Sequence, residues 1–147
     1  MFKRILIPTD GSELSERTAQ SGVALARALN AKVTGLHVMP LNFALSYGEM
    51  VLVDESLEQE MRERARAEGN KYLDRVQAAA ASAGVPFERV LSASIFVWKG
   101  IVDTALEKGC DLIVMAAHGR RGLAALVIGS ETNKVLTHTK IPVLVYR

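Results

Sequence analysis

The segment from Met115 to Ser130 reads MAAHGRRGLAALVIGS, and the fold prediction starts from it. It begins inside an apolar run, CDLIVMAA, whose β-branched residues are typical of a strand buried on both faces. It is followed by ETNKVLTH, in which Val135 and Leu136 are the apolar positions of a short helix that Ser130 can cap. The segment therefore predicts a strand, a glycine-containing loop and a helix N-terminus in succession.

A turn from strand to helix of this kind favours the binding of an anion. Backbone N–H groups of the loop and of the first helical turn point at one place, where the helix adds about half a unit of positive charge. Gly119 and Gly129 have no Cβ, which permits a positive φ and lets a ligand approach the backbone closely. We expect phosphate groups to lie over Gly119, Gly129 and Ser130.

Strand and helix signals alternate along the whole chain, which predicts a parallel α/β sheet with helices on both faces. We expect strands at residues 3–8, 32–38, 88–94, 110–117 and 142–146. We expect helices from about residue 12 to 29, over 56–83, over about 99–108 and after Gly129. Ser12 or Asp10 is expected to cap the first helix and Asn30 to end it in a left-handed conformation. The third helix is expected to turn four residues inward: Ile101, Val102, Ala105 and Leu106.

The order of these segments resembles that of the universal stress protein family. The opening FKRILIPTDGSELSE resembles the family's first strand and turn, LHVMP the end of its second strand, and KIPVLVYR its last strand. The ATP-binding members carry Gly-x-x-Gly, nine residues, and then Gly-Ser or Gly-Thr. Here Gly119 and Gly129 with Ser130 match that pattern, and Ala116 stands at the first glycine.

The resemblance covers the chain from end to end and implies one domain over residues 1–147. It also implies a doubly wound five-stranded parallel sheet in the order 3-2-1-4-5. Ligands of such sheets bind beyond the carboxyl ends of the strands at the point where the strand order reverses. That point brings Pro8, Thr9 and Asp10 opposite the segment from Met115 to Gly119.

The resemblance implies an adenine nucleotide, ATP, ADP or AMP, at this point. Asp10 can accept hydrogen bonds from ribose hydroxyls or hold Mg²⁺ or Mn²⁺ beside the phosphates, and the backbone of Val38 can read the adenine edge. Thr132 is placed to donate to a terminal phosphate, with a surface position as the alternative. The predicted nucleotide-binding residues come from both ends of the chain: Pro8, Thr9, Asp10, Val38, Met115, Ala116, His118, Gly119, Arg120, Gly129, Ser130, Glu131 and Thr132.

Three functions are compatible with this pattern. The first is a stress-associated regulator that binds ATP or AMP. The second is a dimeric signalling or interaction module that keeps the fold but has lost nucleotide affinity, because Ala116 crowds the ligand and Glu131 repels phosphate. The third is a slow ATP hydrolase that uses Asp10 and a metal ion. His118 is interpreted as shaping the loop, and no residue is assigned a catalytic role.

Composition favours a cytoplasmic domain with one core. The chain has 147 residues, 49% of them hydrophobic, and a net charge of +2, so we expect no nucleic-acid partner. The early apolar run ILI is too short for a secretory or membrane segment. Cys110 is expected to be a buried apolar group, and the three histidines lack the spacing of metal ligands.

Two further segments carry expectations. Residues 42–55 combine a glycine with scattered apolar side chains and no clear period, so we expect a mobile segment that acts as a hinged lid or a partner surface, with a plain crossover loop as the alternative. The strand from Pro142 to Tyr146 lies at an edge of the implied sheet and is strongly apolar. Because an uncovered apolar edge favours aggregation, we expect a homodimer in which two such strands pair antiparallel; a monomer protected by Lys140 and Arg147 is the alternative.

Overall fold

The computed structural model describes residues 1–41, 55–119 and 128–147. Arg120 and most of the predicted lid at 42–55 lie outside these residues. The described elements are β1 (Arg4–Pro8), α1 (Glu13–Leu29), β2 (Lys32–Pro40), α2 (Glu55–Ala83), β3 (Phe87–Ser94), α3 (Val97–Glu107), β4 (Leu112–Ala116), α4 (Ser130–His138) and β5 (Val143–Tyr146).

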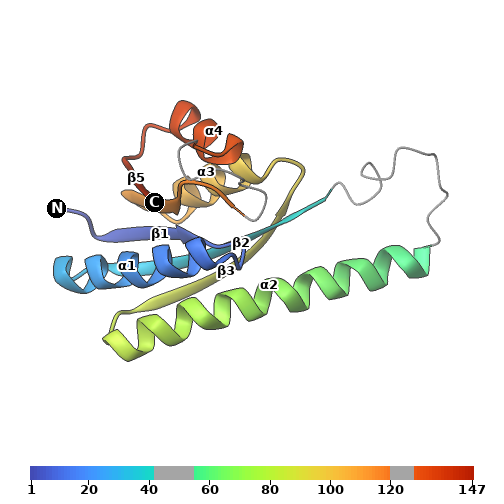
Figure 1. The fold of residues 1–147 in the computed structure, drawn as a ribbon, viewed down its shortest axis with the longest axis horizontal. Coiled ribbons are helices and arrows are strands. Elements are labelled where there is room, and N and C mark those ends of the chain that lie inside the picture. The colour runs from blue at the N-terminus through green and yellow to red at the C-terminus, as the bar shows by residue number, and fades with distance from the viewer. Residues whose placement is uncertain (42–54, 120–127) are drawn as a thin grey trace.

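The strands form a parallel sheet in the order β3-β2-β1-β4-β5, which confirms the predicted topology. Alternate residues of each strand face opposite sides of the sheet. In β1, Ile5 and Ile7 pack with Val23 of α1 and Val76 of α2, whereas Leu6 packs with residues of α3 and α4. The helices therefore form a layer on each face of the sheet, α1 with α2 and α3 with α4 (Figure 1).

Both ends of α1 follow the sequence prediction. The Ser12 hydroxyl accepts a hydrogen bond from the Ser15 N–H at 3.2 Å, so Ser12 is the N-cap. Asn30 ends the helix in the left-handed region, with φ at 53°. The Ser12 cap fixes where the chain leaves β1, at the edge of the sheet where a ligand is expected, and Asn30 fixes where the chain turns into β2.

Three leucine side chains of the described helices are exposed. Leu57 lies in the first part of α2, which extends past the edge of the sheet (Figure 1), and it is 48% exposed. Leu106 was expected inward but is 63% exposed. At about 100° per residue it lies about 150° from the centre of the stripe formed by the buried residues of α3, so it faces solvent. Leu136 of α4 is also exposed, whereas its neighbour Val135 is buried in the core.

Cys110 lies between α3 and β4 and is buried, as predicted. Burial raises the pKa of its thiol. Because the thiolate is the reactive form, we expect an aromatic disulfide reagent to label the native protein at least about tenfold more slowly than the denatured protein. The chain has one cysteine, so the absorbance change reports this thiol alone. Equal labelling rates in buffer and in denaturant would contradict the buried placement.

Candidate nucleotide site at the reversal of strand order

Asp10 and Gly119 lie against each other where β1 and β4 end. A Cβ built on Gly119 would overlap Oδ2 of the Asp10 carboxylate. The two residues are far apart in the sequence, and the pairing of β1 with β4 brings them to one edge of the sheet. The two loops that the sequence places at the strand reversal are thus in contact, with a carboxylate from one loop against a residue of the other that has no side chain.

The turn after β1 is tightly hydrogen-bonded. Thr9 is 6% exposed; its N–H donates to the Leu36 carbonyl at 2.8 Å, and its hydroxyl accepts from the Gly11 N–H at 3.2 Å. Oδ1 of Asp10 accepts from the Ser12 N–H at 3.0 Å. Asp10 therefore supports the start of α1, although Ser12 is its cap, and its carboxylate is held over the end of the sheet.

Gly129 packs directly against the end of β4. Its N–H donates to the Ala117 carbonyl at 2.7 Å, and a Cβ on it would lie 3.2 Å from Cα of His118. Neither Gly119 nor Gly129 has φ in the left-handed region, so the expectation that they supply a positive φ is wrong. Close approach of neighbouring atoms, the end of the Asp10 side chain at Gly119 and backbone atoms of residues 117 and 118 at Gly129, is what disfavours a larger residue at both positions.

The N-terminus of α4 lies beside this contact. Gly129 is the N-cap and offers no side-chain hydrogen bond. The N–H groups of Ser130, Glu131 and Thr132 have no acceptor within the helix, because they precede its first complete turn. Ser130 is exposed, so its hydroxyl and N–H are accessible to an anion.

Glu131 does not have the position that the sequence suggested. One carboxylate oxygen accepts from the Trp98 N–H at 2.8 Å, and the other lies 3.3 Å from Nζ of Lys134. The N-cap of α3, Phe96, supplies no side-chain hydrogen bond, so Glu131 caps α3 from the neighbouring helix. Its negative charge is thereby engaged away from the expected phosphates. No local sequence signal links residues 98 and 131.

Thr132 and Ala116 also differ from expectation. Thr132 is buried, and its hydroxyl donates to the Ala116 carbonyl at 2.9 Å, so this donor is not available to a terminal phosphate. Strand alternation puts the Ala116 methyl on the same face as Val114, which packs with α1. The methyl therefore points away from α4 and its N–H groups. Met115 is buried in the core between the sheet and α3.

Val38 lies where its backbone can contact a ligand. β2 pairs with β1 only as far as Leu36, but it pairs with β3 as far as Pro40. The Leu36 carbonyl faces β1, because it accepts from Thr9. Residues two apart in a strand direct their backbone groups to the same side, so the N–H and C=O of Val38 also face the β1 side of β2, at a point beyond the last residue of β1. Its side chain packs against Gly100 of α3.

The sequence assigns His37 no role beyond the lack of metal-ligand spacing, but in the structure its side chain contacts the turn after β1. Its Nδ1 lies 2.8 Å from the Thr9 carbonyl oxygen. His118 follows β4, and its backbone contacts Gly129, which agrees with a role in shaping the loop. Pro8 is the last residue of β1 and is half-buried at the same edge.

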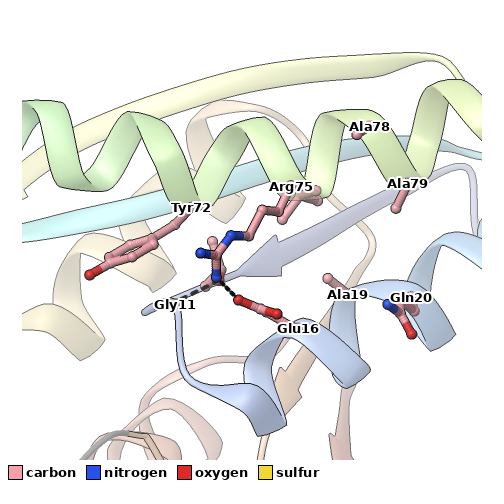
Figure 2. A pocket seen from close by; sticks show the side chains of 10 residues that line it. Gly11, Glu16, Ala19, Gln20, Tyr72, Arg75, Ala78 and Ala79 are labelled. Carbon is pink, nitrogen blue, oxygen red and sulfur yellow. Dashed lines mark hydrogen bonds and ion pairs between the residues drawn. The ribbon is translucent and has the colours of Figure 1, made fainter.

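A cavity of about 300 Å³ opens on the other side of Thr9, between α1 and α2 (Figure 2). Arg75 of α2 reaches across it to pair with Glu16 of α1. Alanine and valine side chains make up much of the remaining wall, and Glu16 offsets the charge of Arg75, so the cavity offers phosphate no uncompensated positive side chain. It is lined by Thr9, Gly11, Glu16, Ala19, Gln20, Tyr72, Arg75, Val76, Ala78 and Ala79.

The residues at the strand reversal fit a metal ion only together with a ligand. In the part of the chain that the structure describes, no three His, Cys, Asp or Glu side chains cluster as a metal site would require. Asp10 supplies one carboxylate, and a divalent cation there needs phosphate oxygens and water to complete its coordination. Within the described ranges, no helix is long and apolar enough to cross a bilayer.

Comparison with known proteins agrees with this fold. The model of the universal stress protein family matches residues 1–147. The chain belongs to this family. It is 32% identical to universal stress protein YxiE of Bacillus subtilis, over the full length of both chains. The solved structure of protein MJ0577 has a TM-score of 0.80 at 27% identity, with 99% of this chain and 96% of that chain covered.

Two universal stress proteins of the same fold were crystallised with nucleotides. One structure is a complex with cAMP, at a TM-score of 0.66, 22% identity and coverage of 99% of this chain and 97% of that one. The other, from Archaeoglobus fulgidus, is a complex with dAMP, at a TM-score of 0.67, 18% identity and coverage of 100% and 98%. At 22% and 18% identity, the likeness of these two structures to this chain shows that they share its fold.

Proposed function

We propose that this universal stress protein is a cytoplasmic, homodimeric regulator that binds ATP or AMP where the strand order reverses. The observation that carries the proposal is the convergence of three groups at one edge of the sheet. These are the Asp10 carboxylate against Gly119, the N-terminus of α4 without a side-chain cap, and the backbone of Val38 beyond the end of β1.

Each group suits one part of an adenine nucleotide. The exposed Ser130 and the N–H groups of the first turn of α4 bind phosphate. Asp10 accepts hydrogen bonds from ribose hydroxyls, and the N–H and C=O of Val38 pair with the adenine edge. The cAMP and dAMP complexes of other family members support the adenine nucleotide class. Arg120 stays a predicted phosphate ligand outside the described residues.

The same site leaves room for Mg²⁺ or Mn²⁺ bound jointly by Asp10 and the nucleotide. A divalent cation there would offset part of the phosphate charge. Asp10 is suited to this role because Ser12 fixes one carboxylate oxygen while the other faces Gly119, at the end of the loop from β4.

The rival function, an interaction module without nucleotide affinity, rests on Ala116 and Glu131. The described contacts weaken both arguments. The Ala116 methyl is on the face of the sheet opposite α4, and the Glu131 carboxylate bonds to the Trp98 N–H and pairs with Lys134. Neither side chain therefore obstructs the phosphate site.

Titration calorimetry of the unchanged protein with ATP and AMP, with and without Mg²⁺, tests the proposal. We expect both to bind at one site per chain. GTP should bind about tenfold more weakly, because guanine loses the hydrogen bonds that the Val38 backbone offers to adenine. Absence of heat for every adenine nucleotide under both conditions would overturn the proposed function in favour of an interaction module.

A further inference from the structure

His37 lies beside the candidate site and is engaged with the turn that carries Asp10. It follows Leu36 in β2 and is half-buried. Its Nδ1 is 2.8 Å from the Thr9 carbonyl oxygen. A carbonyl oxygen only accepts hydrogen bonds, so Nδ1 must carry the proton and donate it. The neutral ring is therefore the Nδ1–H tautomer.

The orientation of this ring is set by α2. The His37 ring meets the Tyr72 ring edge to face, with centroids 5.2 Å apart and planes at 73°. Gly69, one turn earlier in α2, lies directly over the imidazole, since a Cβ there would be 2.5 Å from Cδ2 of His37. The Tyr72 hydroxyl donates to Glu68 in the same helix. The imidazole is thus fixed by its neighbours with Nδ1 aimed at Thr9.

Both backbone groups of Thr9 are consequently bonded to β2. The N–H donates to the Leu36 carbonyl at 2.8 Å, and the carbonyl accepts from His37. The carbonyl of Thr9 belongs to the peptide bond that leads into Asp10, so a group that fixes this carbonyl also fixes the start of the Asp10 turn. The two bonds set the height and the rotation of the turn above the sheet.

We propose that His37 is a positioning residue for nucleotide binding: it holds the Thr9 carbonyl so that the Asp10 carboxylate faces Gly119 and the ribose of an adenine nucleotide. This inference rests on the proposed function and assigns His37 a part in it. His37 acts through Thr9 and touches no ligand. It also makes α2, through Gly69 and Tyr72, a support of the site.

Variants of His37 separate the hydrogen bond from the packing of the ring. His37→Asn keeps an N–H donor near the position of Nδ1 but loses the ring, whereas His37→Leu keeps apolar bulk and loses the donor. We expect His37→Leu to weaken ATP binding about tenfold, as loss of a well-placed hydrogen bond does, and His37→Asn to recover most of it. His138→Asn is the matched control, because His138 contacts Trp98 at 4.4 Å between ring centroids and does not reach Thr9.

A role limited to packing gives a different pattern. It would lower the melting temperature of both His37 variants without nucleotide and would give no recovery of affinity in His37→Asn. If wild-type protein binds ATP and His37→Leu binds it equally well, the positioning role is wrong and the proposed function stands. If the unchanged protein binds no adenine nucleotide, both are wrong.

The tautomer of His37 provides a measurement that needs neither a variant nor a nucleotide. Long-range ¹H–¹⁵N correlation spectra distinguish a protonated Nδ1 from a protonated Nε2 in a neutral imidazole. We expect the Nδ1–H form for His37 in the free protein. The Nε2–H form would overturn the hydrogen bond to Thr9, and with it the positioning role, even if His37→Leu fails to fold.

Discussion

Replacement of Gly129 by valine is expected to abolish nucleotide binding. A Cβ at this position would lie 3.2 Å from Cα of His118 and 3.3 Å from the Ala117 carbonyl oxygen, both of them backbone atoms with little freedom to move. The added side chain therefore pushes the start of α4 away from the end of β4. The N–H groups that bind phosphate move with it, and loss of two or more charge-assisted hydrogen bonds weakens binding about a hundredfold or more.

Asn133→Val is the matched control for this substitution. Asn133 is exposed in α4, one turn after Gly129, so valine there introduces the same β-branched side chain near the start of this helix without approaching the loop from β4. We expect this control to bind ATP like the unchanged protein in titration calorimetry. Retained affinity in Gly129→Val, with the control also binding, would show that phosphate does not lie over α4.

Proline in place of Val145 is expected to convert a homodimer into monomers. The Pro142 and Tyr146 carbonyls accept hydrogen bonds from Ile113 and Ala117 of β4, at 2.9 and 2.7 Å. By alternation, the N–H of Val145 points away from β4, toward the outer edge. Among the described residues, no strand pairs with that edge. Proline there leaves the bonds to β4 intact and removes a donor that an antiparallel partner strand needs.

Val145→Ala separates the backbone effect from the side chain. It keeps the N–H and trims the same side chain, so we expect it to stay dimeric at concentrations where Val145→Pro is a monomer. Sedimentation equilibrium at micromolar concentration measures both, with melting curves to confirm that each variant folds. A monomeric unchanged protein would overturn the dimer and favour an edge protected by Lys140 and Arg147. The exposed Leu144, at 41%, makes such a bare edge an aggregation hazard.

Features that depend on neighbouring residues were predictable from the sequence. Ser12 caps α1 through a residue three positions away, and Asn30 ends that helix in its own left-handed conformation. The strands follow from their apolar runs, and the order of elements fixed the topology once the family resemblance was recognised. These signals depend on residues close together in the sequence, so they can be recognised without knowing how the elements pack.

Contacts between distant residues were not predictable. Glu131 bonds to the N–H of Trp98, and His37 to the carbonyl of Thr9, only because the fold brings their elements together. The sequence points to Gly119 for its conformational freedom, whereas in the structure the end of the Asp10 side chain occupies the space of a Cβ. Helical periodicity placed Leu106 at the border of the apolar stripe and could not tell which side of that border the sheet covers.

The structure of crystals grown with ATP tests the central claim most directly, because the described residues offer two different places beside Thr9. The account predicts phosphate oxygens within hydrogen-bonding distance of the Ser130 N–H and hydroxyl, with ribose hydroxyls at Asp10. Nucleotide bound instead in the cavity between α1 and α2, against Arg75 and Tyr72, would contradict the assignment of the site (Figure 2).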